Sequence, residues 1–160
     1  MKRNLLTMTM FVAVSVFFAT SAMATDYYPG TECVLGYSAT NNLYYSMNQA
    51  LSDETYSSNF YCPMYSNSGG FTQMRGGVHV IDTNSTYDVS CSLRTFGISG
   101  TSYNYSTKTS TGSSTTPQGL IFDYVSRASG RAYVYMRCSV PGKDGSSRSG
   151  IHSYYSTQSY

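Results

Sequence analysis

Tryptophan is absent from this chain of 160 residues, and charged residues make up only 11% of it. The absence of Trp excludes a true immunoglobulin domain, whose core carries a Trp between two bridged cysteines. The few acidic residues form no evident acid–base pair and no Gly-x-Ser-x-Gly motif occurs, so no catalytic site is predicted. The absence of a Cys-x-x-Cys spacing argues against a zinc site.

Long apolar runs are absent after the first 24 residues. A basic N-terminus precedes the mostly apolar segment Leu5–Phe18, and Ala22-Met23-Ala24 matches a signal-peptidase cleavage site. The apolar segment is shorter than the roughly 20 residues that a membrane-spanning helix needs. We therefore predict that Met1–Ala24 is a secretory signal peptide and that residues 25–160 form one secreted or periplasmic domain with no membrane span.

The mature chain carries no net charge of either sign. The full sequence has 10 Lys and Arg and 8 Asp and Glu, so removal of Lys2 and Arg3 with the signal peptide leaves eight of each. Phosphate backbones and anionic lipids are bound through clustered positive charge. Nucleic acid is therefore excluded as a partner, and anionic lipid is not expected.

Tyrosine, serine, threonine and glycine dominate what is present, with 17 Tyr and 14 Gly. This composition disfavours helices and favours strands joined by turns. About eight stretches alternate apolar and polar residues between turn signals. We predict an all-β fold, an antiparallel two-sheet sandwich of jelly-roll or immunoglobulin-like type.

The segment Gly76–Leu93 shows the clearest alternation, and we predict that it forms a central β-hairpin. Val78, Val80 and Asp82 share one face of its first strand. The second strand directs Val89, Cys91 and Leu93 into the core, after a polar turn.

All four cysteines follow the predicted cleavage site, and an even number in an exported chain indicates two disulfides. Three pairings are possible, and we favour the sequential one, Cys33–Cys62 and Cys91–Cys138. Cys138 lies in the alternating segment Arg131–Val140 on the apolar side, so it and Cys91 both face the core, as a bridge requires.

The order of cysteines and turns resembles that of short secreted, two-disulfide proteins of uncharacterised function from Gram-negative bacteria. The positions that carry the resemblance are Pro29-Gly30, Cys33, Cys62-Pro63, the strand Val78–Asp82, Cys91-x-Leu93 and Cys138-x-x-Pro141. They cover most of the mature chain. The resemblance implies an exported β-sandwich and brings no activity with it.

Asp82, Asn84 and Asp88 place oxygen-bearing side chains at the rhythm of a calcium loop. The loop pattern also needs Gly at its sixth position and Glu at its twelfth, where Tyr87 and Leu93 stand. A turn in which the Asp and Asn side chains bond their own backbone explains the same spacing. The turn is the favoured interpretation, and a calcium site is the alternative.

Arg131, Tyr133, Tyr135 and Arg137 share the face of their strand that points away from the core, and Tyr61 does so on another strand. Exposed Tyr beside Arg can stack on sugar rings or pack against a partner protein. The alternative is that Tyr serves only as a strand former in cross-strand pairs.

Three functions remain open from the sequence. The favoured one is a non-catalytic binding or surface-interaction protein whose Tyr-rich face binds a glycan or another surface protein. The second is a structural subunit of an extracellular fibre or surface layer. The third is a secreted hydrolase or hydrolase inhibitor, although His79 and His152 are isolated in the sequence.

Overall fold

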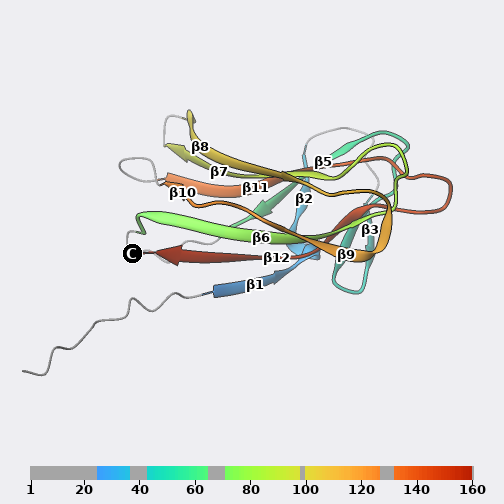
Figure 1. Ribbon diagram of the computed structural model, residues 1–160, viewed down its shortest axis with the longest axis horizontal. Coiled ribbons are helices and arrows are strands. Elements are labelled where there is room, and N and C mark those ends of the chain that lie inside the picture. The colour runs from blue at the N-terminus through green and yellow to red at the C-terminus, as the bar shows by residue number, and fades with distance from the viewer. Residues whose placement is uncertain (1–24, 37–42, 65–70, 98–99, 127–131, 160) are drawn as a thin grey trace, which may run out of the picture.

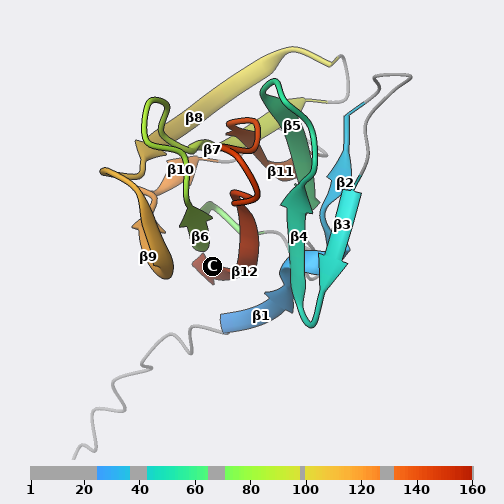
Figure 2. The same ribbon diagram turned by 90° about the vertical axis from the view of Figure 1, so that its right-hand side faces the viewer.

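The computed structural model describes residues 25–36, 43–64, 71–97, 100–126 and 132–159. Two antiparallel sheets pack face to face, as Figures 1 and 2 show from two directions. The prediction of an all-β, two-sheet sandwich is confirmed. The predicted signal peptide, Met1–Ala24, lies outside the described residues, and the first strand begins at Thr25.

The first layer, sheet A, has the order β10-β6-β12-β4-β3, with β9 also paired to β6 and β1 to β12. The two central strands are the longest in the described chain, and the strands at their sides are shorter. The seven strands are β1 (Thr25–Pro29), β3 (Leu43–Ser46), β4 (Gln49–Ser52), β6 (Gln73–Asp82), β9 (Ser114–Ile121), β10 (Val125–Ser126) and β12 (Gly150–Ser159).

The second layer, sheet B, has the order β2-β5-β11-β7-β8. One short 3-10 helix, η1 (Gly30–Glu32), leads from β1 of sheet A into β2 of sheet B. The five strands are β2 (Val34–Leu35), β5 (Ser58–Pro63), β7 (Ser90–Gly97), β8 (Ser102–Thr109) and β11 (Ala132–Val140).

The structure has twelve strands in its described part, more than the eight predicted. Most of the additional strands are two to five residues long, too short for an alternating pattern to stand out in the sequence. The Ser- and Thr-rich composition of Thr109–Gln118 predicts an exposed loop, and that prediction is wrong in part, because β9 begins at Ser114 and pairs with β6.

Alternation places the core between the sheets as predicted. Val78 and Val80 of β6 are buried in sheet A, and Val89, Cys91 and Leu93 are buried in or next to β7 of sheet B. The inward side chains of β11 complete the centre of sheet B, and they are Val134, Met136, Cys138 and Val140.

The predicted hairpin Gly76–Leu93 is wrong, because β6 and β7 belong to different sheets. Strand β6 pairs with β12, β9 and β10, whereas β7 pairs with β11 and β8. The connection between them crosses from one layer to the other. Alternation fixes which side chains of a strand face inward, but it does not fix which strand lies alongside. The inward faces of β6 and β7 therefore agree with the prediction, whereas their pairing does not.

The buried carboxylate of Asp82 holds this crossing in place. Its Oδ2 accepts hydrogen bonds from the backbone N–H of Val89 and the hydroxyl of Ser110, at 3.1 and 2.5 Å. Its Oδ1 accepts from the hydroxyl of Ser149 and the backbone N–H of Asn84, both at 3.3 Å. Val89 and Ser110 flank strands of sheet B, and Ser149 precedes β12 of sheet A, so one side chain links the two layers.

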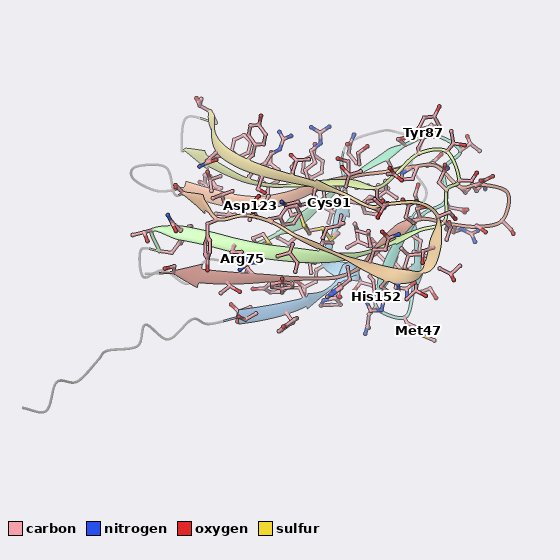
Figure 3. The ribbon with its side chains drawn as sticks, viewed as in Figure 1. Met47, Arg75, Tyr87, Cys91, Asp123 and His152 are labelled. Atoms are coloured by element: carbon pink, nitrogen blue, oxygen red, sulfur yellow. A yellow bond between two sulfur atoms is a disulfide. The ribbon has the colours of Figure 1, made fainter. Side chains whose placement is uncertain are left out.

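Both disulfides, Cys33–Cys62 and Cys91–Cys138, form in the sequential pairing, and both lie in sheet B. Cys91 and Cys138 are directly opposite each other on β7 and β11, and Figure 3 shows Cys91 between the layers. Cys33 immediately precedes β2 and bonds to Cys62 on the neighbouring β5. Two disulfides indicate an oxidising extracellular or periplasmic environment, and the described residues include no helix that could cross a membrane.

Candidate functional site

The outer face of sheet B gathers four of the side chains that the sequence singled out, together with three that it did not. Because successive residues of a strand point to opposite sides, burial of Val134, Met136 and Cys138 directs the residues between them outward. The register then lines up outward residues from neighbouring strands. We call this surface the Tyr–Arg face, and its residues are Tyr61, Arg94, Phe96, Tyr105, Tyr133, Tyr135 and Arg137.

Aromatic rings form a continuous group across the middle of the Tyr–Arg face. The ring of Tyr135 stacks on Phe96 with centroids 4.9 Å apart, and it makes a tilted contact with Tyr61 at 5.7 Å. Tyr133 lies opposite Phe96 in the β11–β7 register and is 67% exposed. Ring pairs at these distances stabilise one another beyond their burial, so the surface has a fixed shape.

The two arginines of the face are held by hydrogen bonds and by aromatic rings. Arg94 Nε donates to the Ser92 hydroxyl at 2.8 Å, and its guanidinium lies 5.8 Å from the ring centre of Tyr105. Arg137 donates through Nε and Nη2 to Asn59 Oδ1, at 3.3 and 3.1 Å. Its guanidinium also lies 6.0 Å from the ring centre of Tyr61. These contacts orient both cations without neutralising them.

An open polar pocket of about 230 Å³ lies among β7, β8 and β11 on this face. Hydroxyl groups and the two guanidinium side chains form its lining. The lining residues are Ser90, Ser92, Arg94, Thr107, Arg137 and Ser139.

The structure brings Tyr61, Tyr133, Tyr135 and Arg137 onto one face, as the sequence placed them. Arg131 lies outside the described residues.

Sequence analysis missed three members of the Tyr–Arg face, Arg94, Phe96 and Tyr105. Arg94 and Phe96 alternate with the buried Leu93 and Thr95, which is a signal for outward positions, but only the strand pairing reveals that they lie beside Tyr135. Tyr105 joins the face because it lies opposite Arg94.

The side chains considered for calcium make hydrogen bonds within the β6–β7 connection. Asp82 is fully buried and bonds as described above. Asn84 Oδ1 accepts from the backbone N–H groups of Thr86 and Tyr87 at 2.9 and 2.8 Å, while Asp88 is exposed. Across the described ranges, no three His, Cys, Asp or Glu residues are grouped to hold a metal. The geometry supports the turn interpretation, and calcium binding stays an untested hypothesis.

The two histidines, isolated in the sequence, meet at one hydroxyl on sheet A. Ser153 Oγ lies 3.1 Å from His79 Nδ1 and 3.2 Å from His152 Nδ1. Pairing of β6 with β12 sets His79 opposite Ser153, which the sequence could not show. A hydrolytic Ser–His pair needs a carboxylate to orient its imidazole, and in the described part of the chain no Asp or Glu contacts either ring. His152 lies away from sheet B in Figure 3.

Two carboxylates elsewhere on the surface form ion pairs. The hydrogen bond from Arg148 Nε at 2.8 Å, helped by Lys143 at 3.4 Å, lowers the pKa of Asp53. The hydrogen bond from Lys108 Nζ at 3.0 Å lowers the pKa of Asp123, which is labelled in Figure 3. None of these ion pairs lies in the pocket of the Tyr–Arg face.

Comparison with known proteins adds no assignment, because no protein-family model and no curated protein matches this chain. The resemblance to short secreted bacterial proteins implied a sandwich and no activity. The chemistry of the Tyr–Arg face is therefore the basis for assigning a function.

Proposed function

We propose that residues 25–160 form an exported, non-catalytic binding protein whose Tyr–Arg face binds carbohydrate. The observation that carries the proposal is the ring of Tyr135 packed between Phe96 and Tyr61, with Arg137 near the Tyr61 ring and Arg94 near the Tyr105 ring. Aromatic rings stack on the apolar faces of sugars, and guanidinium and hydroxyl groups supply hydrogen bonds to sugar oxygens. A flat, half-polar surface of this kind suits a sugar chain better than it suits an apolar ligand.

Export is the second part of the proposal. The signal peptide Met1–Ala24 would direct the chain out of the cytoplasm of a bacterium, to the periplasm or the medium. Two disulfides fit such a compartment. A protein in the periplasm or the medium meets polysaccharides of the cell surface and of the surroundings.

A glycan array tests the proposal directly. We expect the mature wild-type chain to bind a subset of glycans, and Tyr135→Ala to weaken that binding about tenfold or more, because the ring platform loses its centre. Tyr133→Ala should weaken it less, because Tyr133 is at the margin of the ring group.

Tyr87→Ala provides a matched control for the Tyr133 variant. Tyr87 is also 67% exposed, but it lies in the β6–β7 connection and not on the Tyr–Arg face. It should bind glycans as the wild type does. Equal losses in the Tyr87 and Tyr135 variants, or no glycan binding by the wild type, would contradict the proposal.

A structural subunit of a fibre or surface layer is the second candidate, favoured by one observation. Strand β8 is the last strand of sheet B in the described chain and is eight residues long, so one of its edges is available to pair with another strand. Electron microscopy of the purified chain over a range of concentrations tests this candidate. Ordered polymers would favour it, and a monomer at every concentration would rule it out.

A further inference from the structure

The pocket of the Tyr–Arg face has the chemistry of an anion site. Its six lining residues include two arginines, and no acidic residue is among them in the described chain. The remaining four residues carry hydroxyl groups, which donate and accept hydrogen bonds. The lining has no aliphatic side chain. Charge and hydrogen bonding, and not burial of apolar surface, would hold a ligand there.

The register explains why two positive charges meet in the pocket. Tyr135 lies opposite Arg94, and Arg137 lies two residues further along β11 on the same face. Arg94 and Arg137 are therefore diagonal neighbours, and residues in diagonal positions on a sheet are usually about 7–8 Å apart. Neighbouring like charges on a sheet face are unfavourable unless an opposite charge accompanies them.

No carboxylate within the described ranges supplies that opposite charge. The three ion pairs found there use Lys108, Lys143 and Arg148. Arg94 and Arg137 take part in none of them. An anion bound between these two arginines would remove the repulsion and gain two charge-assisted contacts.

Both guanidinium groups keep donors free for such an anion. Arg94 uses only Nε toward Ser92, so both of its terminal amino groups lack an acceptor among the described residues. Arg137 uses Nε and Nη2 toward Asn59 and keeps Nη1. The contacts that occupy the other donors also fix the position of each side chain. Little conformational freedom is lost when a ligand binds a side chain that is already held in place.

We propose that this pocket binds the carboxylate of an acidic sugar, an inference that rests on the carbohydrate-binding function proposed above. Arginine matches a carboxylate through parallel N–H···O bonds. The volume of about 230 Å³ is below the usual range for drug-sized ligands and suits one sugar ring. The ring platform beside the pocket would then carry the neighbouring sugar of the chain.

Two sources of a carboxylated sugar share this chemistry. One is a uronic acid unit within a polysaccharide, and the other is a terminal sialic acid. Binding is therefore measured by isothermal titration calorimetry with oligogalacturonate and with sialyllactose. Methyl-esterified oligogalacturonate and lactose are the uncharged partners of these two probes. Tight binding to one acidic probe identifies the source.

We expect an acidic probe to bind about tenfold or more tightly than its uncharged partner. Arg94→Gln and Arg137→Gln should each remove most of this preference and leave affinity for the uncharged partner nearly unchanged. Tyr135→Ala should weaken the binding of both the acidic probe and its uncharged partner. Arg75→Gln is the matched control, because Arg75 lies on sheet A beside Tyr124 and should change neither affinity.

The outcomes separate this inference from the function on which it rests. If neutral and acidic glycans bind equally, the anion site is wrong and carbohydrate binding stands. If sulfated glycans bind and carboxylated ones do not, the assignment to carboxylate is wrong. If no glycan binds, the proposed function itself is wrong. The comparison of ester with acid needs no variant, so a variant that misfolds does not weaken the test.

Discussion

The two sheets are stabilised by different means. Both disulfides belong to sheet B, with three cysteines in its strands and Cys33 directly before β2, whereas sheet A contains no cysteine and relies on the pairing of its two ten-residue strands, β6 and β12. On the outside, sheet B carries the Tyr–Arg face, and sheet A carries the two histidines around Ser153. The covalent cross-links thus occur in the layer that presents the candidate binding surface.

The Cys91–Cys138 disulfide lies directly behind the pocket of the Tyr–Arg face. Cys91 and Cys138 are opposite each other between two other pairs, Ser90 with Ser139 and Ser92 with Arg137. The side chains of those two pairs line the pocket on the outside of the sheet. The disulfide on the inner side therefore fixes the spacing of the two strands that shape the pocket.

Neither disulfide joins one sheet to the other. Apolar packing and the chain connections hold the layers together, and the buried carboxylate of Asp82 adds a polar link between them. The comparison teaches that the cross-links stiffen one layer, while the contact between the layers depends on non-covalent interactions. Variants of the disulfides, of Asp82 and of the surface ion pairs test that separation.

Removal of a disulfide should have the largest effect on stability. We expect Cys91→Ser with Cys138→Ser to lower the free energy of unfolding by about 2–5 kcal/mol, because the unfolded chain regains the freedom of a closed loop. Urea denaturation of the oxidised wild type and the variant measures the change. Cys33→Ser with Cys62→Ser is the matched control, since its loop spans 29 residues instead of 47.

The two double variants should differ in binding more than in stability. Loss of Cys91–Cys138 should weaken ligand binding in the pocket, because β7 and β11 line it. Loss of Cys33–Cys62, which joins neither strand of that pair, should leave binding close to that of the wild type in folded protein. The reverse order would show that the disulfide below the pocket does not shape it.

Substitution of the carboxylate between the sheets should have an intermediate effect. We expect Asp82→Asn to lower the free energy of unfolding by about 1–3 kcal/mol, because an amide nitrogen cannot accept the hydrogen bonds of Val89 and Ser110. Thermal unfolding followed by circular dichroism measures it. Asp88→Asn is the control, because Asp88 is exposed in the same connection, and a loss as large in that variant would contradict the structural role of Asp82.

The surface ion pairs should have the smallest effect, and only at acidic pH. Asp53 has a pKa lowered from its ordinary value of 3.8 by Arg148 and Lys143. A carboxyl group with a lowered folded-state pKa stabilises the fold fully above its unfolded value and loses that contribution as the pH falls through the folded-state pKa. Wild type should therefore exceed Asp53→Asn in melting temperature at pH 7, and the difference should shrink as the pH falls below 3.8 and through the lowered folded-state pKa.

Asp123→Asn provides the comparison for this pH series. The Asp123 side chain is 79% exposed against 30% for Asp53, so water screens its pairing with Lys108 more strongly. Its difference from wild type should be the smaller one at every pH. A difference in the Asp53 variant that persists unchanged at low pH would mean that its ion pairs are not the cause.

Local pattern predicted the faces of the strands well. Alternation in the segments around Cys91 and Cys138 placed both sulfur atoms inside, and it placed Tyr133, Tyr135 and Arg137 outside. The same pattern failed for the predicted hairpin, since two alternating strands joined by a polar turn look alike whether they pair or cross between layers. Two short strands of sheet A, β1 and β4, were missed because four or five residues are too few for alternation to stand out.

The residues of the candidate site also fall into two groups, those that one strand's pattern predicts and those that need the strand pairing. Tyr61, Tyr135 and Arg137 could be found one strand at a time, because each is an outward position next to buried neighbours. Arg94, Phe96 and Tyr105 gained their meaning only from the β7–β11 and β7–β8 registers. The pocket needs side chains from three strands, and no single segment contains it.

The sequence by itself determined the all-β class and the inward and outward faces of the main strands, because side-chain direction has a period of two along any strand. Only the tertiary structure decided which strands are neighbours, and hence that two unpaired arginines share one pocket and that Asp82 links two sheets. Strand neighbours are set by packing between residues far apart in the chain, and that packing leaves no periodic trace in the local sequence.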